Sequence, residues 1–394
     1  MLTGYNFVYF GPGPWPGLWR NRHHLMTRFA RCNRVLYVEP PPYLRPTVNQ
    51  LLRSRKAWQA LRKPHLSQVQ DNLYVYHSPA FAPVSGRLPL STITHIMRRA
   101  LLLRAIRCLG MEQPIIWLSR PEMRSLIGQF HEQLTIYHVV DEYTAYQGVT
   151  EELASRLRLQ EEQLMAKVDL VIAVSLPLWE AKRPYNPHTY LVPNGVDFEA
   201  FNHALVEKAP PPMDLNVIPE PRLVYAGLIG VRLDLTLLLA VAQRRPDWSF
   251  VFIGQVDDRG CENELVYLHR LPNVHFLGIK PASAVPSYLL ACQVCLLPYH
   301  WSEESRHIDP IKLYEGLASG KPVVSTPIPA VLPYSDLIRL ASDHGELEAA
   351  VQEALAEQDD DRVAQRRSVA AANTWEKRVE QISTLLRLHL DDGE

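Results

Sequence analysis

A helix that leads directly into a buried strand is the feature that most constrains the fold, and it occupies residues 308–326 of the 394-residue chain. The sequence there is IDPIKLYEGLASGKPVVST, in which apolar residues recur at helical spacing. Asp309 can cap the helix, and Pro310 suits its first position. Gly320 suits the left-handed position that ends a helix, and residues 322–326 have the β-branched character of a short strand. This arrangement is typical of α/β domains.

The first turn of this helix also carries a chemical signal. A helix N-terminus offers free backbone N–H groups and a partial positive charge, which together favour an anion such as a phosphate. Lys312 adds a full positive charge, and Glu315 lies three residues on, on the same face. This pair could hold a nucleotide diphosphate, with the lysine on phosphate and the carboxylate on sugar hydroxyls. An ordinary surface Lys–Glu pair explains the spacing equally well, and a capping Asp309 would compete with an anion for the same N–H groups.

The same pattern of strand, glycine turn, helix and strand opens both halves of the chain. In the first half, strands expected at residues 5–10 and 34–39 flank a Gly/Pro loop. In the second half, strands expected at 223–226 and 249–254 flank a turn at Gly227. This order begins a doubly wound α/β domain. The first loop lacks G-x-G-x-x-G, so a dinucleotide fingerprint is absent. Five prolines between residues 210 and 221 mark the best domain boundary.

A carboxylate follows the buried strand predicted at residues 134–140. Active groups gather beyond the carboxyl ends of strands in open α/β sheets. Asp141 is therefore placed to take a proton from an acceptor hydroxyl as a general base. Glu142 and His138 are the alternatives for that role. Asp141 could instead cap a helix, and His138 could be a satisfied histidine within the strand.

Charge is distributed unevenly along a chain whose formal net charge is −1. Residues 1–130 contain 18 Lys or Arg and 4 Asp or Glu, a net +14, and the remainder carries −15. We expect the first part to meet a phospholipid surface, a diphosphate-linked acceptor or nucleic acid, unless it is only a solvated basic face. The basic amphipathic segment at residues 51–63 fits a membrane interface or an ordinary packed helix. No nucleic-acid module is visible, so we expect no nucleic-acid partner.

Composition and cysteine usage point to a cytoplasmic protein. No apolar run reaches the ~18–20 residues of a membrane span, and the N-terminal sequence lacks the basic start of a signal peptide. The five cysteines are scattered, which fits a reducing compartment. Cys292 and Cys295 have C-x-x-C spacing in an apolar stretch, and we expect them to be buried small residues and not metal ligands.

The stretch at 308–326 resembles the donor-binding helix of GT-B glycosyltransferases related to glycosyltransferase family 4 and to bacterial cell-surface polysaccharide enzymes. The family pattern P-x-K-x-x-E stands here as Pro310, Lys312 and Glu315, followed by GKPVV at 320–324. VPNGVD at 192–197 resembles the end of the family's first domain. The resemblance implies two Rossmann-like domains that face a cleft, at 1–205 and 215–375. It also implies that a C-terminal helix at about 376–394 crosses back to the first domain.

The resemblance also implies roles for individual residues. Gly17 and Gly227 would bring backbone close to the donor, Arg232 and Lys312 would bind its diphosphate, and Glu315 would bind ribose hydroxyls. The backbone at Ile279 and Lys280 would contact the nucleotide base. The donor-binding set is Gly17, Gly227, Arg232, Ile279, Lys280, Pro310, Ile311, Lys312 and Glu315, with Asp141 as the catalytic base. His307 stands where the family often has a glutamate.

These implications predict a hexosyltransferase that moves a sugar from a nucleotide-diphosphate sugar to an acceptor hydroxyl on a lipid-linked or cell-surface glycan. No D-x-D metal motif stands at a suitable position, so we expect no metal and no cofactor, with protein cations in their place. The expected location is the cytoplasm, with contact between the basic first domain and the inner face of an anionic membrane. A sugar-nucleotide epimerase or hydrolase of the same architecture, and a catalytically silent GT-B scaffold, are the alternatives.

Overall fold

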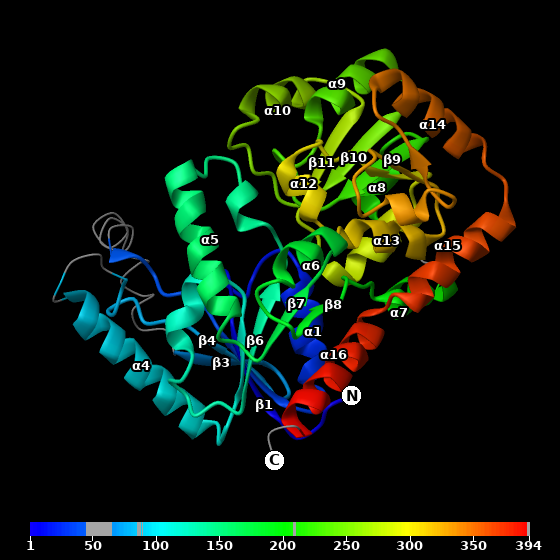
Figure 1. Ribbon diagram of the computed structural model, residues 1–394. Coiled ribbons are helices and arrows are strands. Elements are labelled where there is room, and N and C mark those ends of the chain that lie inside the picture. The colour runs from blue at the N-terminus through cyan, green and yellow to red at the C-terminus, as the bar shows by residue number, and fades with distance from the viewer. Residues whose placement is uncertain (45–64, 85–87, 89, 208–209, 392–394) are drawn as a thin grey trace.

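The computed structural model describes residues 1–44, 65–84, 88, 90–207 and 210–391. Two largely parallel sheets organise these residues, and helices cover the faces of each sheet (Figure 1). The first sheet has eight strands in the order β3-β4-β2-β1-β5-β6-β7-β8, and the second has six in the order β11-β10-β9-β12-β13-β14. The predicted α/β architecture with doubly wound sheets is confirmed. The domain limits of 1–205 and 215–375 stay predictions. The strands of the first sheet fall within the first range, and those of the second sheet fall within the second.

The first sheet pairs in parallel except at one edge, where β3 runs antiparallel to β4. Its strands are β1 (Asn6–Phe10), β2 (Arg34–Val38), β3 (Leu66–Gln70), β4 (Leu73–Tyr76), β5 (Ile115–Leu118), β6 (Leu134–Val139), β7 (Leu170–Ala173) and β8 (Thr189–Leu191). The helices that connect them are α1 (Asn21–Phe29), α4 (Leu90–Cys108), α5 (Glu151–Met165) and α6 (Leu176–Lys182), with 3₁₀ turns η1 (Pro121–Leu126) and η2 (Tyr143–Ala145).

The second sheet is parallel throughout. The strand that comes first in its sequence lies in the middle of the sheet, as in Rossmann-type domains. Its strands are β9 (Arg222–Ala226), β10 (Ser249–Ile253), β11 (Val274–Gly278), β12 (Val294–Leu297), β13 (Val323–Ser325) and β14 (Arg339–Leu340). Its helices are α7 (Phe198–Glu207), α8 (Met213–Asn216), α9 (Leu235–Arg244), α10 (Glu262–His269), α11 (Val285–Leu290), α12 (Glu303–His307), α13 (Ile311–Ser319), α14 (His344–Ala356) and α15 (Asp360–Ala372), with 3₁₀ turns η3 (Ala282–Ala284) and η4 (Leu332–Tyr334).

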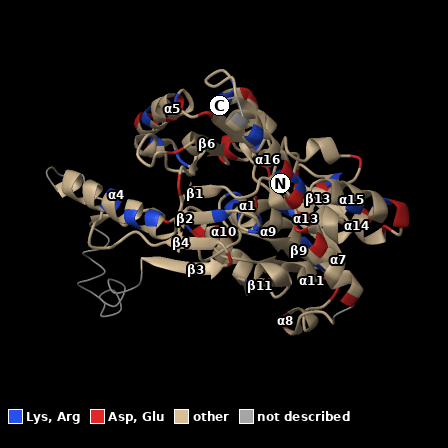
Figure 2. Cartoon of the chain, turned by 90° about the horizontal axis from the view of Figure 1, so that it is seen from below, with Lys and Arg blue, Asp and Glu red and all other residues tan. Residues whose placement is uncertain are grey.

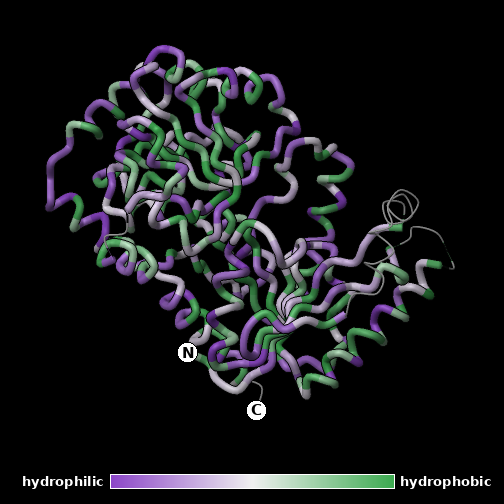
Figure 3. Tube along the Cα trace, turned by 180° about the vertical axis from the view of Figure 1, so that it is seen from behind, coloured by the Kyte–Doolittle hydropathy of each residue, from purple (hydrophilic) through white to green (hydrophobic). Residues whose placement is uncertain are grey.

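Both faces of the first sheet are buried, because parallel strands need helices on each side. Along β6, Leu134 and Ile136 pack into one apolar cluster, while Tyr137 and Val139 pack into the cluster on the opposite face. This alternation makes the strands nearly continuous hydrophobic runs, and hydrophobic residues concentrate along the central strands in Figure 3. Continuous runs of this kind are what allowed the strands to be predicted from the sequence.

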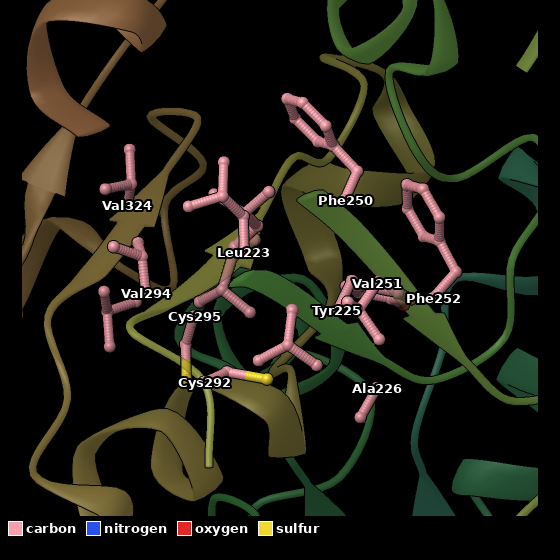
Figure 4. Packing of buried hydrophobic residues seen from close by; sticks show 14 of the residues in the cluster. Leu223, Tyr225, Ala226, Phe250, Val251, Phe252, Cys292, Val294, Cys295 and Val324 are labelled. Atoms are coloured by element: carbon pink, nitrogen blue, oxygen red, sulfur yellow. The ribbon is translucent and has the colours of Figure 1, made fainter. Parts of the chain in front are cut away.

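The second sheet has its own core, part of which is drawn in Figure 4. Cys292 and Cys295 lie in this core, and both are free thiols. Burial raises the pKa of Cys292 to about 12 and that of Cys295 to about 11, so both thiols stay protonated. Within the described ranges, no group of three or more His, Cys, Asp or Glu is arranged to hold a metal ion. The prediction that the two cysteines are buried small residues is confirmed.

The C-terminal helix returns to the first sheet, as predicted. Helix α15 ends at Ala372, and the next helix, α16 (Trp375–Asp391), runs alongside α1 (Figure 1). Trp375, Val379, Ile382 and Leu386 are buried in the same cluster as one face of the first sheet. Trp375 stacks on the His24 ring with 4.7 Å between ring centroids and 7° between ring planes. The crossing helix is therefore part of the first core.

Several short elements differ from the predictions. The sequence predicts a helix near Pro121 to Phe130 and a loop over residues 299–307, whereas the structure has only the 3₁₀ turn η1 in the first range and the helix α12 in the second. Strands β3 and β8 and helix α7 were not predicted. The amphipathic segment predicted at residues 51–63 lies outside the described residues. In the part of the chain that the structure describes, no helix combines the length and the apolar character that a membrane crossing requires.

Candidate active site

A cleft of about 830 Å³ lies beyond the carboxyl ends of strands from both sheets. The first half of the chain contributes residues 17–19 and His24, which follow β1. The second half contributes Gly227 after β9, Gly254 after β10 and residues 279–283 after β11. Lys312 and Glu315 on α13 complete this wall, and α7 closes a further side. The cleft thus lies where ligands bind in open α/β sheets.

The start of α13 differs from the predicted cap. Pro310 is the N-cap residue, helical geometry begins at Ile311, and no side chain caps the first turn. The Asp309 carboxylate accepts instead from the backbone N–H of Asn194 at 2.5 Å and from the Tyr314 hydroxyl at 3.1 Å. The prediction that Asp309 caps this helix is therefore wrong, because a neighbouring loop supplies a better donor. Its carboxylate consequently does not compete for the N–H groups of the first turn.

Lys312 and Glu315 form an ion pair on the wall of the cleft. Lys312 Nζ lies 2.8 Å from Glu315 Oε2, and the two side chains are 23% and 14% exposed. The predicted common face is therefore confirmed. Lys312 belongs to the first turn of a helix that no side chain caps, so an anion beside it in this partly buried space would also feel the positive end of the helix dipole.

Glycines shape the floor of the cleft. Gly17 has φ +127°, a backbone conformation that side chains rarely allow, and a Cβ there would meet open space. Gly227 and Gly254 lie against each other, since a Cβ on Gly254 would stand 1.8 Å from the Gly227 carbonyl oxygen. Bare backbone therefore faces the cleft at these positions. Gly17 and Gly227 were predicted to lie at the donor site, but Gly254 was missed. The signal was available, because Gly254 directly follows β10 just as Gly227 directly follows β9.

The far end of the cleft lies after β11. Gly278 has φ +69°, and the backbone then passes Ile279 and Lys280 along the wall. The Lys280 ammonium bonds Asp214 on α8 at 2.5 Å. Because the side chain is engaged there, a ligand at this end would meet mainly the backbone, the kind of contact predicted for these two residues.

Asp141 and Arg232 do not line this cleft but pair with each other where the two halves of the chain meet. Arg232 Nη2 lies 3.2 Å from Asp141 Oδ1, and Arg232 Nε lies 2.6 Å from Glu304 Oε1. Asp141 Oδ2 accepts a hydrogen bond from the Tyr146 hydroxyl at 2.7 Å. The structure thus brings the predicted base and the predicted phosphate ligand together, and adds Glu304, which was not predicted.

The two alternative bases are differently placed. Glu142 accepts from Lys182 at 2.7 Å, and Lys182 also bonds the buried Glu161, so this carboxylate belongs to an internal ion network. His138 is 1% exposed, and burial lowers the pKa of His138 to about 3. Its Nδ1 has no hydrogen-bond partner among the described residues. Asp141 is therefore the better placed of the three to meet a ligand.

Comparisons with known proteins relate part of the chain to a known family. Residues 221–358 match the family model described as glycosyl transferases group 1. We refer to these residues as the glycosyl transferase domain, after the model that they match. The domain contains β9 to β14 and α13, and it supplies Gly227, Gly254, Lys312 and Glu315 to the cleft.

One curated relative and many solved structures extend the comparison beyond the glycosyl transferase domain. The putative teichuronic acid biosynthesis glycosyltransferase TuaH of Bacillus subtilis (strain 168) is 30% identical over 195 residues, which are 47% of this chain and 47% of TuaH. The match thus spans about half the length of that relative.

Solved structures resemble nearly the whole chain. Sucrose-phosphate synthase from Thermosynechococcus elongatus superposes with a TM-score of 0.69 at 17% identity, over 98% of each chain. HepE of Anabaena, crystallised with UDP-glucose, has a TM-score of 0.65 at 15% identity, over 97% of this chain and 99% of HepE. The predicted GT-B fold, with two Rossmann-like domains that face a cleft, is confirmed.

Other predicted positions near the glycosyl transferase domain are partly engaged elsewhere. Ile311 packs against the core of the first sheet, and neither Ile311 nor Pro310 lines the cleft. His307 is 8% exposed, and its Nδ1 lies 2.8 Å from the Glu303 carbonyl oxygen. The His307 carbonyl accepts from Ser175 at 2.6 Å, which ties α12 to the first half of the chain.

His24 and the α7 residues Ala200, His203 and Glu207 line the cleft but were not assigned to the donor site from the sequence. Burial, followed by the charges of Arg28 and Lys312, lowers the pKa of His24 well below its usual value. The signal for α7 was available, since this helix directly follows the VPNGVD stretch. His24 carried no comparable signal, because only the fold places α1 opposite α13.

Proposed function

We propose that this chain is a glycosyltransferase that moves a sugar from a nucleotide-diphosphate sugar to an acceptor hydroxyl. The observation that carries the proposal is the ion pair of Lys312 and Glu315 at an uncapped helix N-terminus, on the wall of a cleft between two doubly wound sheets. The group 1 glycosyl transferase domain and the TuaH relative support transfer over epimerisation or hydrolysis.

The donor would lie along the wall formed by the second half of the chain. Lys312 and the α13 N-terminus would hold the diphosphate, and Glu315 would turn from Lys312 to the ribose hydroxyls. The bare backbone at Gly17, Gly227 and Gly254 would let the phosphates approach closely. The backbone at residues 279–280 would meet the base, and UDP-sugars are the first donors to test because HepE was crystallised with UDP-glucose.

The acceptor would arrive from the first half of the chain. Its hydroxyl would attack the anomeric carbon of the sugar while Asp141 removes the proton. The bond from the anomeric carbon to the diphosphate oxygen would break, and the leaving diphosphate would keep the electron pair under the positive charge of Lys312 and the helix. The proposed mechanism uses these protein cations without a metal or cofactor.

The acceptor we propose is a lipid-linked or cell-surface glycan, and we propose that the first half of the chain contacts an anionic membrane from the cytoplasm. The name of the TuaH relative refers to teichuronic acid biosynthesis, which supports such an acceptor. Figure 2 colours the basic positions of α4 blue, and the sequence of this helix includes Arg98 and Arg99. Ile93 and Ile96 on the same helix are 53% and 62% exposed. Exposed apolar residues beside arginines suit the surface of an anionic bilayer.

A thermal-shift screen with UDP, GDP, ADP, CMP and TDP sugars tests the proposal. We expect one nucleotide class to raise the unfolding temperature, and Lys312→Ala to remove that shift. The Asp141→Asn variant should keep the shift while transfer falls by about 10²–10⁴-fold, the usual contribution of a general base. Complete donor turnover without any acceptor would indicate an epimerase or hydrolase, and the absence of any nucleotide-dependent shift would indicate a silent scaffold.

A further inference from the structure

Arg232 lies between two carboxylates that come from different halves of the chain. Its Nη2 contacts Asp141 at 3.2 Å and its Nε contacts Glu304 at 2.6 Å. The Asp141 and Glu304 side chains are 17% and 13% exposed, and the Arg232 side chain is 28% exposed. Three charged groups therefore share a partly buried space in which one guanidinium serves two carboxylates.

Tyr146 fixes the geometry of this cluster. Its hydroxyl donates to Asp141 Oδ2 at 2.7 Å, and its ring lies 5.6 Å from the Arg232 guanidinium. The ionisable groups whose charges act on Asp141 or on this tyrosine are Arg20 before α1, Arg120 after β5, Tyr143 and Tyr146 after β6, Arg232 after β9 and Glu304 on α12. Glu304 is the other carboxylate in this set, and it reaches Arg232 from the second half of the chain.

When two carboxylates share one cation, the cation stabilises the ionised form of each less than it would stabilise a single carboxylate. A carboxylate alone with an arginine becomes a weaker base, because the opposite charge stabilises its ionised form. A second carboxylate on the same arginine offsets part of that attraction and adds a like-charge repulsion. Burial raises the pKa of the Glu304 carboxyl, while Arg232 works in the opposite direction.

We propose that Glu304 is a positioning residue that acts through Arg232: its carboxylate holds the guanidinium against Asp141 and takes a share of the positive charge that Asp141 would otherwise have to itself. The proposal rests on the proposed role of Asp141 as general base. It gives α12 a task in the reaction, because this short helix carries Glu304 and is tied to the first half of the chain through His307 and Ser175.

A ¹³C NMR titration of the full chain labelled at the aspartate carboxyl carbons tests the coupling without any substrate. The Asp141 signal is the one lost in Asp141→Asn. Glu304→Gln keeps an oxygen for Arg232 but removes the charge, so the Asp141 midpoint should move to lower pH, by about half to one unit. Arg232→Gln should move it the opposite way. Glu303→Gln, the same change on the adjacent and 61% exposed residue, should leave it unchanged.

Slow release of UDP from UDP-glucose in water gives the kinetic readout. Glu304→Gln should lower kcat by up to about tenfold and shift the acidic limb of the rate profile to lower pH, with KM for UDP-glucose unchanged. An Asp141 midpoint in Glu304→Gln that matches Glu303→Gln, or that moves upward, would overturn the inference. A wild-type chain whose unfolding temperature no sugar nucleotide raises would instead refute the proposed function, and the titration would still decide the coupling.

Discussion

Replacing Lys312 by alanine is the most direct test of the donor site. Lys312 is 23% exposed on the wall of the cleft, and in this structure its ammonium bonds Glu315 at 2.8 Å. A charge-assisted hydrogen bond to a phosphate contributes about 1.5–3 kcal/mol. At 1.36 kcal/mol per factor of ten, Lys312→Ala should lower kcat/KM by about 10- to 150-fold.

The loss should fall mainly on kcat, because the diphosphate gains charge as the sugar departs. The measurement is the initial rate of nucleoside diphosphate release, with the donor that the thermal-shift screen selects. Lys321→Ala is the matched control, since Lys321 follows the other end of α13 and lies outside the cleft. The control should keep its rate, and both variants should fold, because a partly exposed Lys–Glu pair contributes at most ~1 kcal/mol to stability.

A Lys312→Ala variant with wild-type kcat/KM would refute the reasoning that an uncapped helix and a lysine hold the leaving group. An equal loss in Lys321→Ala would refute it too, because the effect would then come from the general charge of the helix. A loss confined to KM would mean that Lys312 binds substrate and transition state equally.

Three further predictions concern stability. Gly254→Ala should lower the free energy of unfolding in urea by about 2–3 kcal/mol, because the φ of Gly254 is +139° and the new Cβ would stand 1.8 Å from the Gly227 carbonyl oxygen. Gly128→Ala is the control: its φ is +79° but the Cβ would meet open space, so the loss should be about 1 kcal/mol. Burial raises the pKa of Asp309 from 3.8 to about 6, so the folded chain holds this proton more tightly than the unfolded chain does. The free energy of unfolding should therefore fall by up to ~3 kcal/mol as pH rises from about 4 through 6. Asp309→Asn should flatten that part of the stability profile, and an unchanged slope would contradict the assignment. Trp375→Ala should cost about 3–5 kcal/mol by chemical denaturation, since this indole is fully buried where α16 joins the first core, and a change below ~1 kcal/mol would show that the crossing helix contributes little.

Local patterns explain why much of the fold could be predicted. Hydrophobic periodicity and turn residues act over a few positions, so the sequence identified α13, its left-handed end at Gly320 and the strand that follows. The C-terminal helix that begins at Trp375 was implied by the resemblance to GT-B enzymes and not by a local pattern. Short elements such as β8 and α12 were missed because three to five residues carry too little periodicity to distinguish them from loops.

The sequence by itself determined the two repeated α/β units and the Lys312–Glu315 face, because residues three apart on a helix are neighbours wherever the helix lies. Only the tertiary structure decided which groups those residues meet. Asp309, which was predicted to cap α13, instead accepts a hydrogen bond from Asn194, 115 positions away. Arg232 pairs with Asp141 and Glu304, which are 91 and 72 positions away. No local pattern encodes such pairs, since they form only when the folded chain brings distant loops together where its two halves meet.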